Sequence, residues 1–270
     1  MKRNIYLIII TVLTVICIVV GSAYNFYGIF SNVFPKKGFS VSGWNAVIDG
    51  ECEVEDAKSI EASISVANIV FVRGDKFMVE YHCSEILQPE IKVQGDTLYI
   101  TQKDTSIWHM GNLKGDITVT VPENCRLENL TVQADVGDVT VDGYTAKVAE
   151  FFLDVGELEV ENSRFEEATV SADVGDITLS DSVMNRLDVE CDTGNAMVAD
   201  VRFEDLTISA DVGDVEVRTV DGLDGYRMDL SGDIGDIKVD GRRCGKEYYV
   251  SEGTSGSITI SNSVGDIDIE

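Results

Sequence analysis

The tetrapeptide Asp-Val-Gly-Asp recurs, with small changes, every nineteen residues through the second half of the 270-residue chain. Five copies keep this spacing and two more follow at wider spacing: Asp135–Asp138, Asp154–Glu157, Asp173–Asp176, Asp192–Asn195, Asp211–Asp214, Asp233–Asp236 and Ser263–Asp266. A fixed period of about 20 residues is typical of folds in which one supersecondary unit stacks on the next. The repeat therefore predicts a stacked architecture.

Side chains on both sides of each repeated glycine alternate between apolar and polar. Apolar residues stand seven, five, three and one positions before the glycine and two and four positions after it, as in Leu130, Val132, Ala134, Val136, Val139 and Val141. This period of two indicates strands with one buried face. We predict an all-β, single-domain, right-handed β-solenoid of about 19-residue coils, because crossover connections between parallel strands are nearly always right-handed.

The corner of each predicted coil has a local explanation. Glycine adopts a positive φ where the chain bends, and the Asp two residues earlier can accept a hydrogen bond from the glycine N–H. Asp-x-Gly-Asp is therefore explained as a turn, without any catalytic role.

The first residues predict export. Residues 1–4, with Lys2 and Arg3, are followed by an apolar run from Ile5 to Val20. We predict a cytoplasmic N-terminus over residues 1–4, one transmembrane helix over 5–27 and a linker over 28–42. A cleaved signal peptide is the alternative for this segment. Residues 43–125 are predicted as a β-rich cap of degenerate coils and residues 126–270 as the regular repeats. The chain is thus predicted to be a single-pass protein of the cell membrane whose C-terminal domain lies outside the cytoplasm.

Charge and cysteine content limit the partners. The formal net charge is −27, which repels nucleic acid and attracts cationic partners. Cys52, Cys83, Cys125 and Cys244 show no CxxC or Cys/His spacing, so no zinc site is expected. The cysteines are interpreted as small buried apolar residues, and the alternative is a disulfide between a pair that the sequence does not identify.

The chain resembles a bacterial putative adhesin family of β-strand-repeat domains, a family of unknown function. The elements that carry the resemblance are the apolar N-terminal run, the Gly95–Ile100 strand, the Ile117–Pro122 strand and the Gly-Asp-centred repeats. The resemblance implies a β-helix-like fold in a cell-envelope protein. It implies no catalytic residues.

The acidic repeats suggest one candidate metal site. Stacked in register, the first Asp of each copy forms a column: Asp135, Asp154, Asp173, Asp192, Asp211 and Asp233. Carboxylates about 5 Å apart repel one another by about 1 kcal/mol in water, and Ca²⁺ would relieve this repulsion. Solvated turn residues without calcium are the alternative, and a second column containing Asn195 is less regular. No other cofactor is expected.

Three further features are weighed against simpler explanations. Trp108 and His109 lie in a loop outside the repeat and are candidates for partner binding or for covering the end of the core. Arg73-Gly74-Asp75 spells a cell-attachment tripeptide, although Gly-Asp is the ordinary turn of this chain. Pairs of carboxylates would also suit a polysaccharide-active enzyme, but acidic pairs are too common here to indicate one.

The function expected from the sequence is a membrane-anchored, non-enzymatic module for adhesion or interaction at the bacterial cell envelope. The membrane itself, another envelope protein or a wall polymer would be its partner, and nucleic acid would not. The alternative is a regulatory module that reports envelope stress to a membrane partner.

Overall fold

The computed structural model describes residues 46–54, 56–103, 113, 115–220 and 222–270. The chain divides into two units, Met1–Ser42 and Gly43–Glu270, and the first lies wholly outside these ranges. This covers the predicted transmembrane segment 5–27 and the linker 28–42. The described ranges also leave out the candidates Trp108 and His109. No helix within the described ranges is long and apolar enough to cross a membrane.

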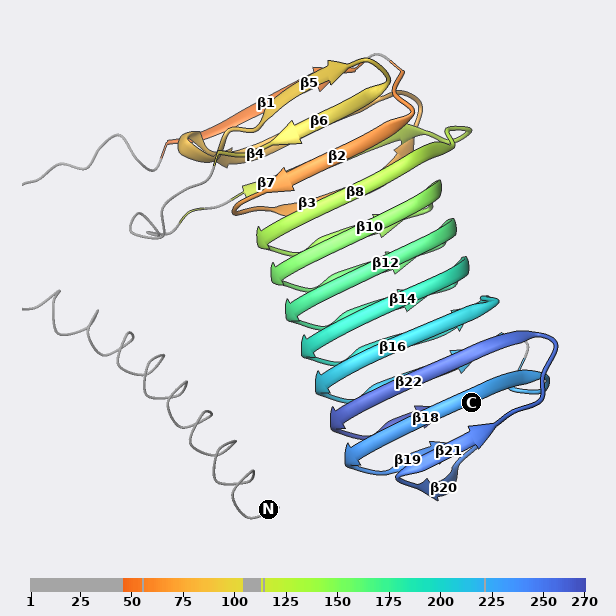
Figure 1. Cartoon of the computed structure of the whole chain (residues 1–270). Coiled ribbons are helices and arrows are strands. Elements are labelled where there is room, and N and C mark those ends of the chain that lie inside the picture. The colour runs from red at the N-terminus through yellow and green to blue at the C-terminus, as the bar shows by residue number, and fades with distance from the viewer. Residues whose placement is uncertain (1–45, 55, 104–112, 114, 221) are drawn as a thin grey trace, which may run out of the picture. The chain divides into compact units, whose positions relative to one another are not determined.

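The second unit is built from two large sheets that lie face to face along the stack (Figure 1). The first sheet has twelve strands in the order β1 (Val47–Glu53), β4 (Met78–Ser84), β7 (Gly115–Pro122), β3 (Asn68–Gly74), β9 (Val139–Asp142), β11 (Leu158–Glu161), β13 (Ile177–Ser180), β15 (Ala196–Val201), β17 (Val215–Thr219), β23 (Ile267–Ile269), β19 (Ile237–Val239) and β20 (Arg242–Gly245).

The second sheet has eleven strands and packs against the first. Their order is β21 (Glu247–Val250), β18 (Tyr226–Ile234), β22 (Gly256–Val264), β16 (Asp205–Val212), β14 (Val183–Thr193), β12 (Arg164–Val174), β10 (Thr145–Val155), β8 (Leu127–Val136), β2 (Ser59–Ile64), β6 (Thr97–Thr101) and β5 (Glu90–Gln94). The 3-10 helix η1 (Glu85–Leu87) follows β4.

The middle of the stack follows the predicted repeat. From β8 to β17 each coil contributes a long strand to the second sheet and a short strand to the first, and partners in neighbouring parallel strands are nineteen residues apart, as Leu153 and Ala172 are. The columns predicted seven, five and three positions before the glycine, and two and four after it, are buried throughout these coils. They form one core between the sheets, because no single coil could bury its own apolar row.

One predicted core column is wrong. The residue directly before the glycine points outward, and Val155, Val174 and Val212 are 47–48% exposed. In β10 the alternation places Leu153 inside and Asp154 outside, but the corner at Gly156 turns the chain toward the first sheet before Val155 can face the core. The next buried residue is Leu158, on the other sheet.

The order of the coils also differs from a sequential stack. The last coil, β22 with β23, lies between the coil of β16 and β17 and the coil of β18 and β19. The antiparallel strands β20 and β21 pair with β19 and β18 and cover the outer edge of that coil. The chain that follows β21 pairs instead with the inner edges of β18 and β19.

At the N-terminal end, too, strands that are distant in the sequence pair with each other. Strands β2 and β3 pair directly with β8 and β9, although β4 to β7 stand between them in the sequence. Strands β1, β4 and β5 run antiparallel to their neighbours and close this end.

The all-β class and the nineteen-residue stacking of β8–β17 agree with the prediction. For the residues that the structure describes, the predicted class of a single-domain right-handed β-solenoid is wrong, and the transmembrane helix predicted before it lies outside them. The correction is an all-β stack of two large sheets in which the coils do not follow one another in sequence order at either end.

Candidate functional site

The repeated glycines form the corner at which the chain passes from the second sheet to the first. They have φ values between +136° and +154°. The N–H of Gly156 donates to the Val174 carbonyl at 3.0 Å and that of Gly175 to the Thr193 carbonyl at 2.9 Å. The bond that holds each corner thus joins neighbouring coils. The predicted bond from the glycine N–H to the Asp two residues earlier is replaced by this one.

The residue after each glycine belongs to a column that links the coils. We name this the ladder column: Asn68, Asp138, Glu157, Asp176, Asn195, Asp214, Asp266 and Asp236. In six of the seven neighbouring pairs, all except Glu157 with Asp176, the backbone N–H of one member donates to the side-chain oxygen of the other, as from Glu157 to Asp138 at 3.0 Å and from Asp236 to Asp266 at 2.8 Å. These charge-assisted bonds offset part of the repulsion between stacked carboxylates.

Asn195 fits this column without an exception. It donates its N–H to Asp176 Oδ1 at 2.7 Å, and its own Oδ1 accepts the N–H of Asp214 at 3.0 Å. An amide oxygen therefore replaces a carboxylate oxygen as acceptor. At this position the column therefore needs a side-chain hydrogen-bond acceptor and does not need a negative charge.

The six Asp residues proposed as a calcium column occupy the outer column of the same corner. Asp135, Asp154, Asp173, Asp192 and Asp211 lie in consecutive coils, as the register of their neighbours shows. Ser263 lies between Asp211 and Asp233, since the last coil is inserted there, and its hydroxyl donates to Asp211 Oδ1 at 3.4 Å. The expected contact of Asp211 with Asp233 is thus not made.

Calcium binding in this column stays a prediction. In the described part of the chain, no group of three or more His, Cys, Asp or Glu side chains is arranged to hold a metal ion. Five of the six side chains are exposed to solvent, and Asp135 is half-buried.

An aliphatic row lies between the outer column and the ladder column. Its members, in stack order, are Val136, Val155, Val174, Thr193, Val212, Val264 and Ile234, and neighbours pair across adjacent strands. Val155, Val174, Val212 and Ile234 are 47–50% exposed. We call the three parallel columns together the corner edge. It presents apolar side chains flanked on both sides by carboxylates, so it suits a partner that is both apolar and cationic.

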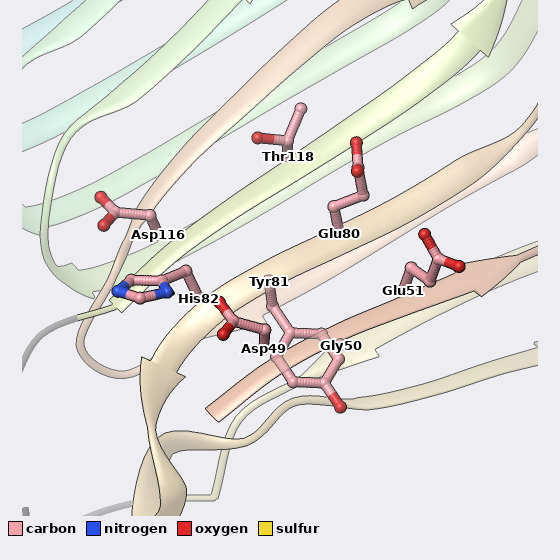
Figure 2. A pocket seen from close by; sticks show the side chains of 8 residues that line it. All are labelled: Asp49, Gly50, Glu51, Glu80, Tyr81, His82, Asp116 and Thr118. Carbon is pink, nitrogen blue, oxygen red and sulfur yellow. Dashed lines mark hydrogen bonds and ion pairs between the residues drawn. The ribbon is translucent and has the colours of Figure 1, made fainter. Parts of the chain in front are cut away.

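A second acidic surface lies at the N-terminal end of the first sheet (Figure 2). It is an open pocket of about 510 Å³ lined by Asp49, Gly50, Glu51, Glu80, Tyr81, His82, Asp116 and Thr118. Antiparallel pairing places His82 between Asp49 and Asp116, and Glu80 between Glu51 and Thr118. His82 Nδ1 lies 2.5 Å from Asp49 Oδ1. The Tyr81 ring points away from this row and lies against Gly50 (Figure 2).

The sequence carries no signal that pairs His82 with a carboxylate or that indicates this pocket. Asp49 and His82 are thirty-three residues apart, and Asp116 lies on a third strand. The antiparallel order of β1, β4 and β7 brings them together, and no nineteen-residue register exists there that could have aligned them.

The Arg73 side chain of the Arg-Gly-Asp tripeptide is bonded within the fold. Its guanidinium donates to the carbonyls of Gly143 and Glu123 and, at 2.9 Å, to Thr145 Oγ1. It thereby ties β3 to the turn before β10. A side chain held in this way does not present itself to a receptor.

Comparison with solved structures finds chains of low identity. A putative adhesin from Bacteroides fragilis NCTC 9343 is 15% identical, with 84% of this chain and 99% of that chain covered and a TM-score of 0.49. A putative cell adhesion protein from Clostridium sporogenes ATCC 15579 is 17% identical, with 83% and 99% covered and a TM-score of 0.41. A putative lipid binding protein from Parabacteroides distasonis ATCC 8503 is 12% identical, with 83% and 96% covered and a TM-score of 0.44.

No curated protein matches the chain. The resemblance stated from the sequence is nevertheless confirmed by a family model, although an N-terminal membrane anchor is no part of that match. Residues 57–270 match the model described as Toastrack DUF4097, and the chain therefore belongs to the Toastrack DUF4097 family.

Proposed function

We propose that this protein is a non-catalytic interaction module that binds a cationic partner through the corner edge. The observation that carries the proposal is the repetition of one exposed acidic chemistry along the stack. Asp154, Asp173, Asp192 and Asp211 stand exposed in four consecutive coils. A surface that repeats the same group at each coil suits a partner that makes many weak contacts at once.

The chemistry of the two acidic columns supports binding in preference to catalysis. Side-chain oxygens of the ladder column accept backbone N–H groups of the neighbouring coil, so they are used to hold the fold. The outer column is solvated.

We further propose that the module acts outside the cytoplasm, at the bacterial cell envelope. Lys2 and Arg3, followed by the apolar run from Ile5 to Val20, support export. The net charge of −27 supports a basic protein or a cationic wall component as the partner.

Binding of poly-L-lysine to the purified full-length chain tests this function. We compare the chain with a variant in which Asp154, Asp173, Asp192 and Asp211 are changed to Asn. The matched control changes four exposed acidic residues elsewhere: Glu61→Gln, Glu159→Gln, Glu190→Gln and Asp229→Asn. Both variants lose the same formal charge.

The outer-column variant is expected to lose about tenfold in affinity at low salt, and the control about twofold. Equal losses would show that the net charge alone attracts the polymer. Absence of saturable binding to the parent chain would overturn the proposal.

A further inference from the structure

We infer that the corner edge is a docking surface for a basic amphipathic helix of a partner protein, lying along the stack. The inference rests on the proposed function, because it requires a cationic partner at this edge. It adds the shape of that partner and the way the partner is recognised.

The first argument is the exposure of the aliphatic row. Val155, Val174, Val212 and Ile234 expose between 47% and 50% of their surface, whereas Val136 and Val264 in the same row are half-buried. Thr193 occupies the same position in a neighbouring coil, so the corner accepts a polar residue of the same shape. Folding alone therefore does not require aliphatic side chains here, whereas an exposed apolar stripe rimmed by polar groups, here interrupted once at Thr193, marks interaction sites.

The second argument is the spacing of the row. Adjacent coils are separated by about 4.8 Å, the ordinary distance between hydrogen-bonded strands. The apolar stripe of an α-helix returns about every 5.4 Å, so each turn drifts from its coil by only about 0.6 Å, which amounts to about 3.6 Å over six coils. An extended strand along the same line would repeat only about every 6.6–6.8 Å and would lose register within two coils.

The length of the row sets the length of the helix. Seven members, from Val136 to Ile234, are separated by six intervals. Six intervals of about 4.8 Å span about 29 Å, which corresponds to about 19 residues of helix at about 1.5 Å per residue.

The third argument is the charge on both flanks. The outer column and the ladder column place carboxylates on either side of the row. A fitting helix therefore carries Lys or Arg on both sides of its apolar stripe, where their long side chains can reach the carboxylates. A second copy of this chain does not fit, since its corner edge is acidic in the same places and the two copies would repel each other.

A designed peptide tests the inference on the full-length chain. The probe has about 20 residues, with Leu at helical i, i+3, i+4 and i+7 positions and Lys on both flanks. A scrambled peptide of the same composition, without the stripe, is its control. Affinity is measured by fluorescence anisotropy, and helix formation by circular dichroism.

The decisive variant is the triple change Val155→Thr, Val174→Thr and Val212→Thr, which copies the residue already present at Thr193. Its matched control is Val47→Thr, Val93→Thr and Val220→Thr, which are 46%, 37% and 48% exposed away from the corner edge. Melting temperatures of both variants confirm that they fold.

We expect the designed peptide to become helical on binding and to bind the row variant about tenfold more weakly than the parent, with a change of about twofold or less for the control. If the row variant binds the peptide as well as the parent, while poly-L-lysine still depends on the outer column, the helix inference fails and the proposed function stands. If neither the peptide nor poly-L-lysine binds, both fail.

Discussion

At each corner, glycine is needed both for its positive φ and because it has no Cβ. At Gly175 the backbone has φ +145°, which L-residues rarely adopt, and a Cβ built there would overlap the carbonyl oxygen of Gly156 in the coil before. The same overlap occurs between Gly194 and Gly175 and between Gly213 and Gly194. The glycine column therefore sets both the bend of each coil and its distance from the next.

Gly175→Ala is expected to destabilise the fold by about 2–4 kcal/mol, since strain at an unfavourable φ alone costs about 1–3 kcal/mol and the coils must also separate. Urea unfolding followed by circular dichroism measures the change. Gly241→Ala is the control, because Gly241 also has a positive φ, +69°, but nothing lies within 4 Å of the position that a Cβ would take there. Equal costs at the two sites would show that coil stacking adds nothing.

The buried Cys191 thiol and the buried Tyr144 hydroxyl make the stability of the fold depend on pH in the alkaline range. Burial first, and then the charges of Asp176 and Asp192, raise the pKa of Cys191 from 9.0 to about 11. Burial likewise raises the pKa of Tyr144, whose hydroxyl donates to the Val119 carbonyl at 3.0 Å. In the unfolded chain these groups lose their protons at lower pH than in the fold.

The stabilisation is therefore complete below about pH 9 and is lost as the pH rises toward 11, because the unfolded state then binds fewer protons. Thermal unfolding at pH 8 and at pH 10.5 checks this direction. Cys191→Ala is expected to flatten the decline, and an unchanged slope in that variant would assign the effect to other groups.

At the scale of elements, the position of a strand in the chain does not give its position in the stack. β22 is the last long strand in sequence, yet it pairs on one side with β16 and on the other with β18. β21 precedes it in sequence but lies at the edge of the sheet. Edge strands expose one row of backbone groups, whereas interior strands have both rows bonded.

Native-state hydrogen exchange is expected to protect the amides of β22 as strongly as those of β14, and to protect β21 least. Mass spectrometry of peptic peptides from these three strands provides the measurement. Were the coils stacked in sequence order, the peptide covering β22 would exchange early, at the rate of a terminal strand.

For the molecule as a whole, the charge is the dominant property. Forty-eight acidic residues face twenty-one basic ones, and the net charge of −27 opposes compaction. Surface ion pairs such as Arg186 with Glu167 at 3.0 Å relieve little of it, because exposed pairs contribute about 0–1 kcal/mol each. Hydrophobic burial between the two sheets must offset the remaining repulsion.

Raising NaCl from about 10 mM to about 500 mM is therefore expected to raise the melting temperature by several degrees, as the screening length falls from about 30 Å to below about 8 Å. Differential scanning calorimetry measures the shift. The variant with Asp154, Asp173, Asp192 and Asp211 changed to Asn should show a smaller rise. A melting temperature that falls with salt would contradict net repulsion.

The sequence predicts which residues form the columns of the corner edge, but it does not predict which of these side chains face solvent. The outer column from Asp135 to Asp211 follows directly from the nineteen-residue register. The row of Val155, Val174 and Val212 is visible in the same register, but the period-two rule assigns it to the core, because that rule takes no account of a corner at which the chain changes direction. His82 and its carboxylate neighbours have no sequence signal.

Local rules can be read from the amino-acid sequence alone: strands from the alternation of side chains, corners from Gly175 and its equivalents, and stacking from the constant period. Which strand edges meet, and which side chains the corners turn outward, depends on the folded chain. Parallel pairing requires a free strand edge and not closeness along the chain. In this fold β20 and β21 take the outer edge, and the last coil, β22 with β23, pairs between two coils that precede it in the sequence.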